Sequence, residues 1–176
     1  MANMRKAIGL GLGAVAALLL FPATANAQSC SGNPCSVNNL VQVNVPTILR
    51  LSLSAATTVL PAATEANFDA GFQDAAGPTA TVKSNRPWNL QVNAQAATWT
   101  GTNGGRATKP AGDLQWSRTG GAPFTALTTT AVNMYGASQG AGGSQATDVT
   151  HRVLWSYTDD TPGDYEITVV YTVTAP

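Results

Sequence analysis

Short segments in which apolar and polar residues alternate recur along the chain, and this pattern restricts its fold more than any other feature. The clearest is Trp88–Ala94, which has an apolar side chain at every second position. Because successive side chains of a strand point to opposite faces, each such segment predicts a strand with one face in a core and one in water. Further predicted strands lie within Leu40–Val45, Ile48–Ser54, Leu114–Trp116, Phe124–Met134, Val149–Tyr157 and Tyr165–Val173.

Clusters of Gly, Pro, Asn and Asp separate these segments, and no segment has sustained helical spacing. About eight short strands between such turns are typical of two antiparallel sheets that pack face to face. Polar residues on one side of each strand agree with this, because antiparallel sheets often keep one face in water. We therefore predict an all-β fold, an antiparallel Ig-like β-sandwich that forms a single domain over residues 37–176.

Three other segments are predicted from their turn residues. Gly101–Gly105 and Gly136–Gly143 are rich in glycine and are expected to be exposed loops. The segment Ala55–Pro78 is ambiguous. We expect one short strand near Val59 followed by a loop, and the alternative is a single helical turn around Ala62–Asn67.

The chain is poor in charge. Charged residues make up 10% of it, against about 25% in typical soluble proteins. Nine basic residues balance nine acidic ones, and there is one histidine. There is thus no basic excess to bind nucleic acid, and few titratable groups for hydrolytic chemistry.

The first 27 residues have the three-part pattern of a secretory signal. Arg5 and Lys6 give a positive start, Ala7–Phe21 is almost wholly apolar, and small residues end at Ala27. We expect cleavage after Ala27 and a protein that is secreted or held in the cell envelope; the alternative is an uncleaved N-terminal anchor. No second long apolar run follows, so no transmembrane segment is expected in the mature chain.

Cys30 and Cys35 are the only cysteines and lie in a short N-terminal segment, residues 28–36. An even pair in an exported chain indicates a disulfide. Closing so short a loop would fix this segment locally and add little to the stability of the fold. The alternatives are a redox-active pair, for which the spacing is not C-x-x-C, and lipid attachment at Cys30, for which the preceding aliphatic residue is missing.

Few side chains are available for catalysis or for a metal. His151 is the only possible imidazole base, it lies within a predicted strand, and no G-x-S-x-G motif accompanies it. One histidine and a paired set of cysteines leave no zinc ligands. Glu65 and Glu166 are the only glutamates that could serve a glycosidase, and they occur in unrelated contexts. We expect no enzyme, no cofactor and no metal, with a carbohydrate hydrolase as the enzymatic alternative.

The acidic turn at residues 159–166 has two interpretations. Its three aspartates and Glu166 supply oxygen ligands that suit calcium, although the EF-hand spacing is absent. The interpretation that we favour is a tyrosine corner formed by Asp160, Gly163 and Tyr165, in which the phenol bonds to nearby backbone.

The four tryptophans could stack on a carbohydrate, but aromatic residues at alternating strand positions more often belong to a core. Trp99, among Thr and Gly residues, is the tryptophan that we expect to be most exposed.

Two tryptophan segments together resemble a known family. Pro87–Val92 is similar to the first W-x-L motif of bacterial WxL-domain surface proteins, and Val153–Pro162 is similar to their distal motif, with a tyrosine where leucine is expected. The end of the chain from Gly163 also looks like the final strand of bacterial Ig-like and coat-type modules. The resemblance implies a β-sandwich at the cell surface that attaches to the envelope or to partner proteins without catalysis. It would put Trp88, Leu90 and Trp155 near the relevant surface or core.

Two functions follow as expectations. The first is a non-catalytic module that binds a cell-envelope polymer or a surface protein. The second is a structural subunit of a coat or fibre, of the spore-coat or pilin type, that self-associates by strand donation. The alternating valines of residues 37–46 motivate the second, because such a segment can complete a neighbour's sheet in place of its own.

Overall fold

The computed structural model describes residues 29–176. The chain divides into two compact units, Met1–Asn44 and Val45–Pro176. The expected signal segment, residues 1–27, lies outside the described residues. In the first unit, residues 29–44 are exposed and contain no helix or strand, and Cys30 and Cys35 form the predicted disulfide.

The second unit is mostly β and its sheets are antiparallel, as predicted. Its helical elements are one short α-helix and one turn of 3-10 helix, namely α1 (Glu65–Ala70) and η1 (Ala111–Asp113). Its strands are β1 (Leu49–Leu53), β2 (Phe72–Ser84), β3 (Asn89–Ala94), β4 (Thr100–Thr102), β5 (Leu114–Ser117), β6 (Thr125–Ala126), β7 (Val132–Asn133), β8 (Gly142–Leu154), β9 (Asp164–Glu166) and β10 (Val169–Thr174).

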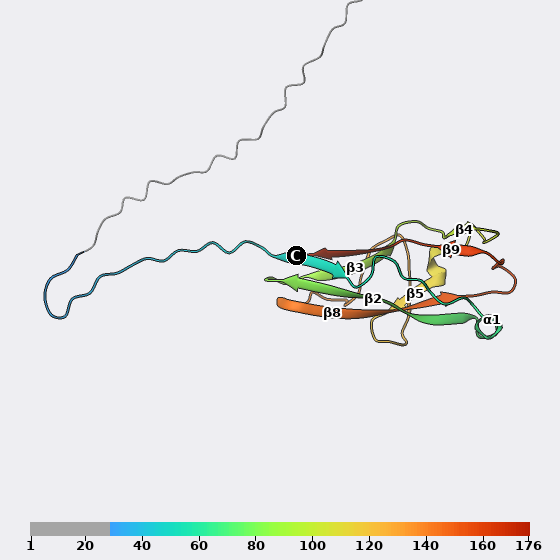
Figure 1. Ribbon diagram of the computed structural model, residues 1–176, viewed down its shortest axis with the longest axis horizontal. Coiled ribbons are helices and arrows are strands. Elements are labelled where there is room, and N and C mark those ends of the chain that lie inside the picture. The colour runs from blue at the N-terminus through green and yellow to red at the C-terminus, as the bar shows by residue number, and fades with distance from the viewer. Residues whose placement is uncertain (1–28) are drawn as a thin grey trace, which may run out of the picture. The chain divides into compact units, whose positions relative to one another are not determined.

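The strands form one large sheet and two smaller ones (Figure 1). The large sheet has the order β1-β2-β8-β5-β6, the second has the order β10-β3-β7, and β4 pairs with β9. The long strands β2 and β8 form the middle of the large sheet, paired from Phe72–Leu154 to Ser84–Gly142. Every pairing is antiparallel.

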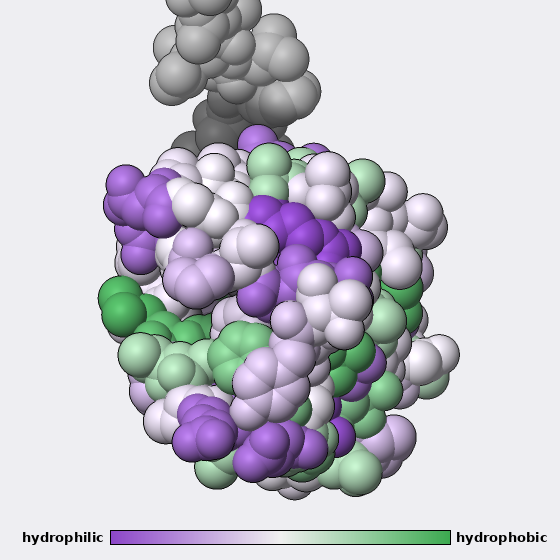
Figure 2. All heavy atoms as spheres, turned by 90° about the vertical axis from the view of Figure 1, so that its right-hand side faces the viewer, coloured by the Kyte–Doolittle hydropathy of each residue, from purple (hydrophilic) through white to green (hydrophobic). Residues whose placement is uncertain are grey.

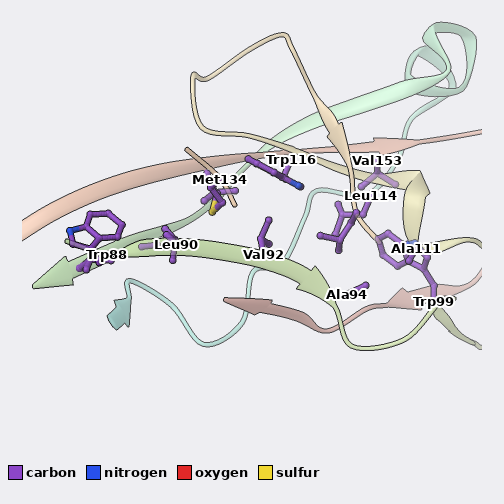
Figure 3. Packing of buried hydrophobic residues seen from close by; sticks show 14 residues of the cluster. Trp88, Leu90, Val92, Ala94, Trp99, Ala111, Leu114, Trp116, Met134 and Val153 are labelled. Atoms are coloured by element: carbon purple, nitrogen blue, oxygen red, sulfur yellow. The ribbon is translucent and has the colours of Figure 1, made fainter. Parts of the chain in front are cut away.

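The core lies between β3 and the strands β5 and β8 of the large sheet (Figure 3). The apolar face predicted for Trp88–Ala94 is confirmed, because its four apolar side chains are at most 1% exposed. The large sheet contributes buried residues from three strands: Ala80, Val82, Leu114, Trp116, Val149 and Val153. The strands β2, β3, β5 and β8 therefore each place one face in a shared core.

Asn85 holds the start of β1 through its backbone and its side chain, and its backbone N–H donates to the Ile48 carbonyl at 3.2 Å. Asn85, just after β2, accepts a hydrogen bond from the Ile48 N–H at 2.9 Å and donates one to the Pro46 carbonyl at 2.8 Å. The side chain thus continues the β1–β2 pairing beyond its last residue pair, Leu49–Ser84.

The prediction for Ala55–Pro78 was wrong in its main form. Val59 is 88% exposed and forms no strand, while α1 begins close to the alternative helical turn. The prediction also missed β2, which contains Gly77 and Pro78. Its register shifts between Ala76 and Thr79, so that both residues fall in a bulge. A bulge tolerates the missing N–H of proline, which would disrupt a regular central strand.

Other predicted boundaries also differ. Leu40–Val45 forms no strand, and β8 begins at Gly142, within the predicted loop Gly136–Gly143. β4 lies partly within the predicted loop Gly101–Gly105. The predicted strand Tyr165–Val173 is instead two strands, because β9 pairs with β4 whereas β10 pairs with β3.

Candidate functional site

A large groove opens on the second unit. Its volume is about 1470 Å³, and its lining comes from residues 53–63, from β5 and β8, and from residues 160–171. Apolar and aromatic side chains in the lining include Leu114, Val153 and Tyr171. At the end of the molecule that carries α1 and β9, apolar residues come to the surface between polar ones (Figure 2).

Two strands with unpaired edges contribute to the groove. β10 pairs only with β3, and β1 pairs only with β2, among the strands of residues 29–176. Leu53 of β1 and Val169 and Tyr171 of β10 line the groove. An unpaired edge presents backbone N–H and C=O groups to which another strand can bond.

The segment Leu40–Val45, in the described N-terminal part of the chain, exposes a row of apolar side chains. Leu40, Val41, Val43 and Val45 are between 70% and 86% exposed. Residues 37–45 include no charged residue. Apolar groups placed in water at every second position cost free energy until another surface covers them.

A buried lysine forms the second unusual site. Lys109 is 0% exposed, and its Nζ donates hydrogen bonds to the Leu154 carbonyl at 2.7 Å and to both carboxylate oxygens of Asp160 at 2.9 Å. Asp113 forms a further ion pair with this Nζ at 3.3 Å. The ammonium also lies 4.7 Å from the centre of the Trp155 ring.

Tyr165, on β9, bonds back to nearby backbone. Its Oη donates to the Thr161 carbonyl at 2.6 Å and accepts from the Arg106 N–H at 3.1 Å. Gly163 has φ +155°, and a Cβ there would overlap the backbone of Gly105. The phenol of Tyr165 thus joins the turn before β9 to the segment after β4, while Asp160 bonds to Lys109 and not to the tyrosine.

The carboxylates of the acidic turn have mainly different hydrogen-bond partners, although Arg106 forms ion pairs with both Asp159 and Asp160, at 4.0 and 3.9 Å. Asp160 holds Lys109, the Ser156 hydroxyl donates to Asp159 at 3.0 Å, and the Asn103 amide donates to Asp164 at 2.5 Å. Within residues 29–176, no group of three or more His, Cys, Asp or Glu side chains is arranged to hold a metal ion. The same residues include no helix long and apolar enough to cross a membrane.

His151, on β8, is 6% exposed. Burial lowers its pKa to about 4, so the imidazole is neutral at pH 7. Its Nε2 lies 3.4 Å from the Tyr171 hydroxyl, and burial raises the pKa of that tyrosine to about 12. Of the two glutamates, Glu65 begins α1 and Glu166 ends β9.

The tryptophans lie mainly in the core. Trp88 and Leu90 are 0% exposed, and Trp155 is half-buried. The prediction for Trp99 was wrong: it is 6% exposed, and its indole N–H donates to the Pro110 carbonyl at 3.0 Å. The segment Lys109–Pro110 lies alongside Trp99, since the backbone N–H of Trp99 donates to the Lys109 carbonyl at 2.8 Å and Thr98 forms a β-bridge with Pro110. The polar sequence around Trp99 does not reveal this pairing.

The site around Lys109 was missed by the sequence analysis. Lys109 stands in a polar segment, Arg106–Pro110, whose composition is that of an exposed loop. Its burial depends on contacts with Leu154 and Asp160, which are 45 and 51 residues away in the sequence.

No protein-family model matches this chain, and a search of curated proteins found no match.

Proposed function

We propose that this protein is a structural subunit that self-associates by strand donation. Residues 37–45 of one copy would pair with the outer edge of β10 in another copy and place their apolar side chains in its groove. The observation that carries the proposal is the combination of an open groove, lined in part by apolar and aromatic side chains, with an exposed alternating segment.

The strand order supports this assignment. In an Ig-type sandwich one sheet has the order A-B-E-D and the other contains C, F and G. In such an assignment β1-β2-β8-β5 would take the places of A-B-E-D, while β3 and β10 would take those of C and F. Within residues 29–176 no strand is hydrogen-bonded to the outer edge of β10, where G would lie. Strand donation from a second copy would fill this position.

The proposed donor fits the proposed acceptor in length and chemistry. Leu40–Val45 and β10 are both six residues long. Val41, Val43 and Val45 would face the groove, while Gln42 and Asn44 would point away from it. Backbone hydrogen bonds would supply affinity, and the alternating side chains would supply register, as in other cases of β-augmentation.

Assembly can be tested with two matched substitutions in the mature protein. Val43→Asp would put a charge into the groove, whereas Gln42→Asp puts the same charge on the opposite face of the donor. We expect light scattering after size-exclusion chromatography to show oligomers for the wild type and for Gln42→Asp, and monomers for Val43→Asp.

A synthetic peptide of residues 37–46 provides a second experiment, which tests binding of the donor segment directly. Added to the Val43→Asp protein, it should raise the Tm, because a ligand that binds only the folded state stabilises it. The same peptide with Val43→Asp should have no effect. A wild-type protein that stays monomeric at high concentration would contradict polymerisation. If the peptide nevertheless binds Val43→Asp, residues 37–45 of the wild type fill the groove of their own chain.

Attachment to an envelope polymer or surface protein remains a separate proposal, motivated by the export pattern and by the two tryptophan motifs. Trp88 and Leu90 are fully buried and would support the fold of such a module without touching its ligand. Sedimentation of the Val43→Asp monomer with envelope fractions would test attachment apart from assembly.

A further inference from the structure

Lys109, Asp160 and Asp113 form a cluster of charges around a fully buried ammonium, and strand donation does not require it. Lys109 is 0% exposed, and the side chains of Asp160 and Asp113 are 3% and 27% exposed. Removing an ion pair from water is costly, and its attraction only partly offsets this cost. Transfer of a proton from the ammonium to a carboxylate gives a neutral amine beside a carboxylic acid. These are the two reactants of amide formation.

The geometry brings the reacting atoms together. Nζ of Lys109 lies 2.9 Å from both Oδ1 and Oδ2 of Asp160. Both oxygens are bonded to Cγ, so Nζ lies close to this carbon, and the attack requires it to move from its hydrogen-bonding position to the face of the carboxyl group. Because the fold holds the amine and the carboxyl group side by side, their reaction needs no encounter between two free molecules, and its barrier is lower.

The surroundings fit the reaction. The N–H of Ser156 donates to Oδ2 of Asp160 at 3.0 Å and would stabilise negative charge that develops on this oxygen. The rings of Trp155 and Tyr165 lie 4.7 and 5.9 Å from Nζ and exclude water from that side. A hollow of about 280 Å³, lined by Asp113, Ser156 and Asp160, offers a path by which water could leave.

We propose that Lys109 and Asp160 form an intramolecular amide bond, with Asp113 as the group that carries the proton. The neutral Nζ attacks Cγ of the protonated Asp160 carboxyl, and Asp113 accepts a proton from the nitrogen. Asp113 returns this proton to the departing hydroxyl, so that the Cγ–O bond breaks and one water is released. Overall, one ammonium and one carboxylate become one amide and one water, and Asp113 is regenerated.

The bond would connect the segment before η1 with the turn after β8, which are 51 residues apart. Such a cross-link limits the unfolded chain in the way that a disulfide does. It requires no oxidant, metal or second protein.

Intact mass spectrometry of the mature protein, reduced and denatured, tests the proposal. We expect a mass about 18 Da below that of the sequence, the loss of one water. Proteolysis should then yield one branched peptide that contains Lys109 and Asp160. A wild-type mass equal to the sequence mass overturns the proposal, and so does a branch at other residues.

Variants identify the role of each residue. Lys109→Met and Asp160→Ala should restore the full sequence mass, while Lys83→Met, at an exposed lysine of β2, should keep the loss. Asp113→Asn should be folded by near-ultraviolet circular dichroism and retain the full mass. If all of the Asp113→Asn protein has the mass that is about 18 Da lower, the role of Asp113 as the proton carrier is overturned. A loss that persists in Lys109→Met would overturn the bond itself.

Discussion

Acidification from pH 7 to pH 4 should destabilise the fold through His151. This imidazole is 6% exposed, and burial lowers its pKa to about 4 from the 6.5 of an exposed histidine. As the pH falls through 6.5, the unfolded chain binds a proton that the folded chain does not yet accept. The free energy of unfolding therefore falls between about pH 6.5 and pH 4, and is independent of this group above that range.

The magnitude follows from the difference between the two pKa values. Each unit of difference corresponds to about 1.4 kcal/mol, so complete protonation of the unfolded state removes about 3 kcal/mol. That is a large part of the roughly 5–15 kcal/mol that stabilises a typical domain.

Urea unfolding of the wild type and of His151→Gln at several pH values isolates this effect, because carboxylates contribute equally to both. The gap between the two proteins should shrink by about 3 kcal/mol between pH 7 and pH 4. Tyr171→Phe is the control: it removes the nearby hydroxyl, whose pKa of about 12 lies outside the range, and should keep the wild-type slope.

The single histidine also makes the direct measurement simple, since its imidazole resonances can be followed by NMR without assignment of others. The midpoint in the folded protein should lie near pH 4. A midpoint near 6.5, or stability curves of the wild type and His151→Gln that run parallel, would refute the reasoning.

Four further substitutions test the fold by urea denaturation. Trp88→Ala should cost about 3–5 kcal/mol because it empties a fully buried site, whereas Val59→Ala, at a position that is 88% exposed, should stay within about 0.5 kcal/mol of the wild type. Gly163→Ala should cost at least about 1 kcal/mol, since its φ of +155° and the adjoining backbone leave no space for a Cβ. Tyr165→Phe should cost about 1–2 kcal/mol, because the Thr161 carbonyl loses its donor. Equal losses of unfolding free energy in Trp88→Ala and Val59→Ala would contradict the burial of Trp88. An unchanged stability of Gly163→Ala or of Tyr165→Phe would contradict the close backbone approach at Gly163 or the bond from Tyr165 to Thr161.

The sequence predicted those strands whose side chains alternate without interruption. β3 is the clearest case, because one face meets the core along its whole length. β2 escaped prediction since Gly77 and Pro78 interrupt its pattern, and only its pairing with β8 shows that they occupy a bulge. A local pattern does not reveal an irregularity that a distant strand accommodates.

Leu40–Val45 shows that an alternating segment does not always form a strand in its own chain. Its alternation resembles that of β3, yet it forms no strand in the described chain. A period of two indicates that a segment can bury one face, and it does not specify which molecule supplies the partner. The cluster around Lys109 was beyond sequence reasoning for another reason, since its members are brought together only by the fold.

The hydrogen bonds of Asn85 to Pro46 and Ile48 have a mechanical consequence if the protein polymerises by strand donation. Tension from the donor segment would enter each subunit at residues 46–48 and act along β1. Force along a strand loads its hydrogen bonds to β2 together, whereas force across it would break them in turn. The two side-chain bonds of Asn85 stand first in this path. Asn85→Ala should therefore lower the force at which single subunits unfold under an optical trap, a property set by the unfolding rate.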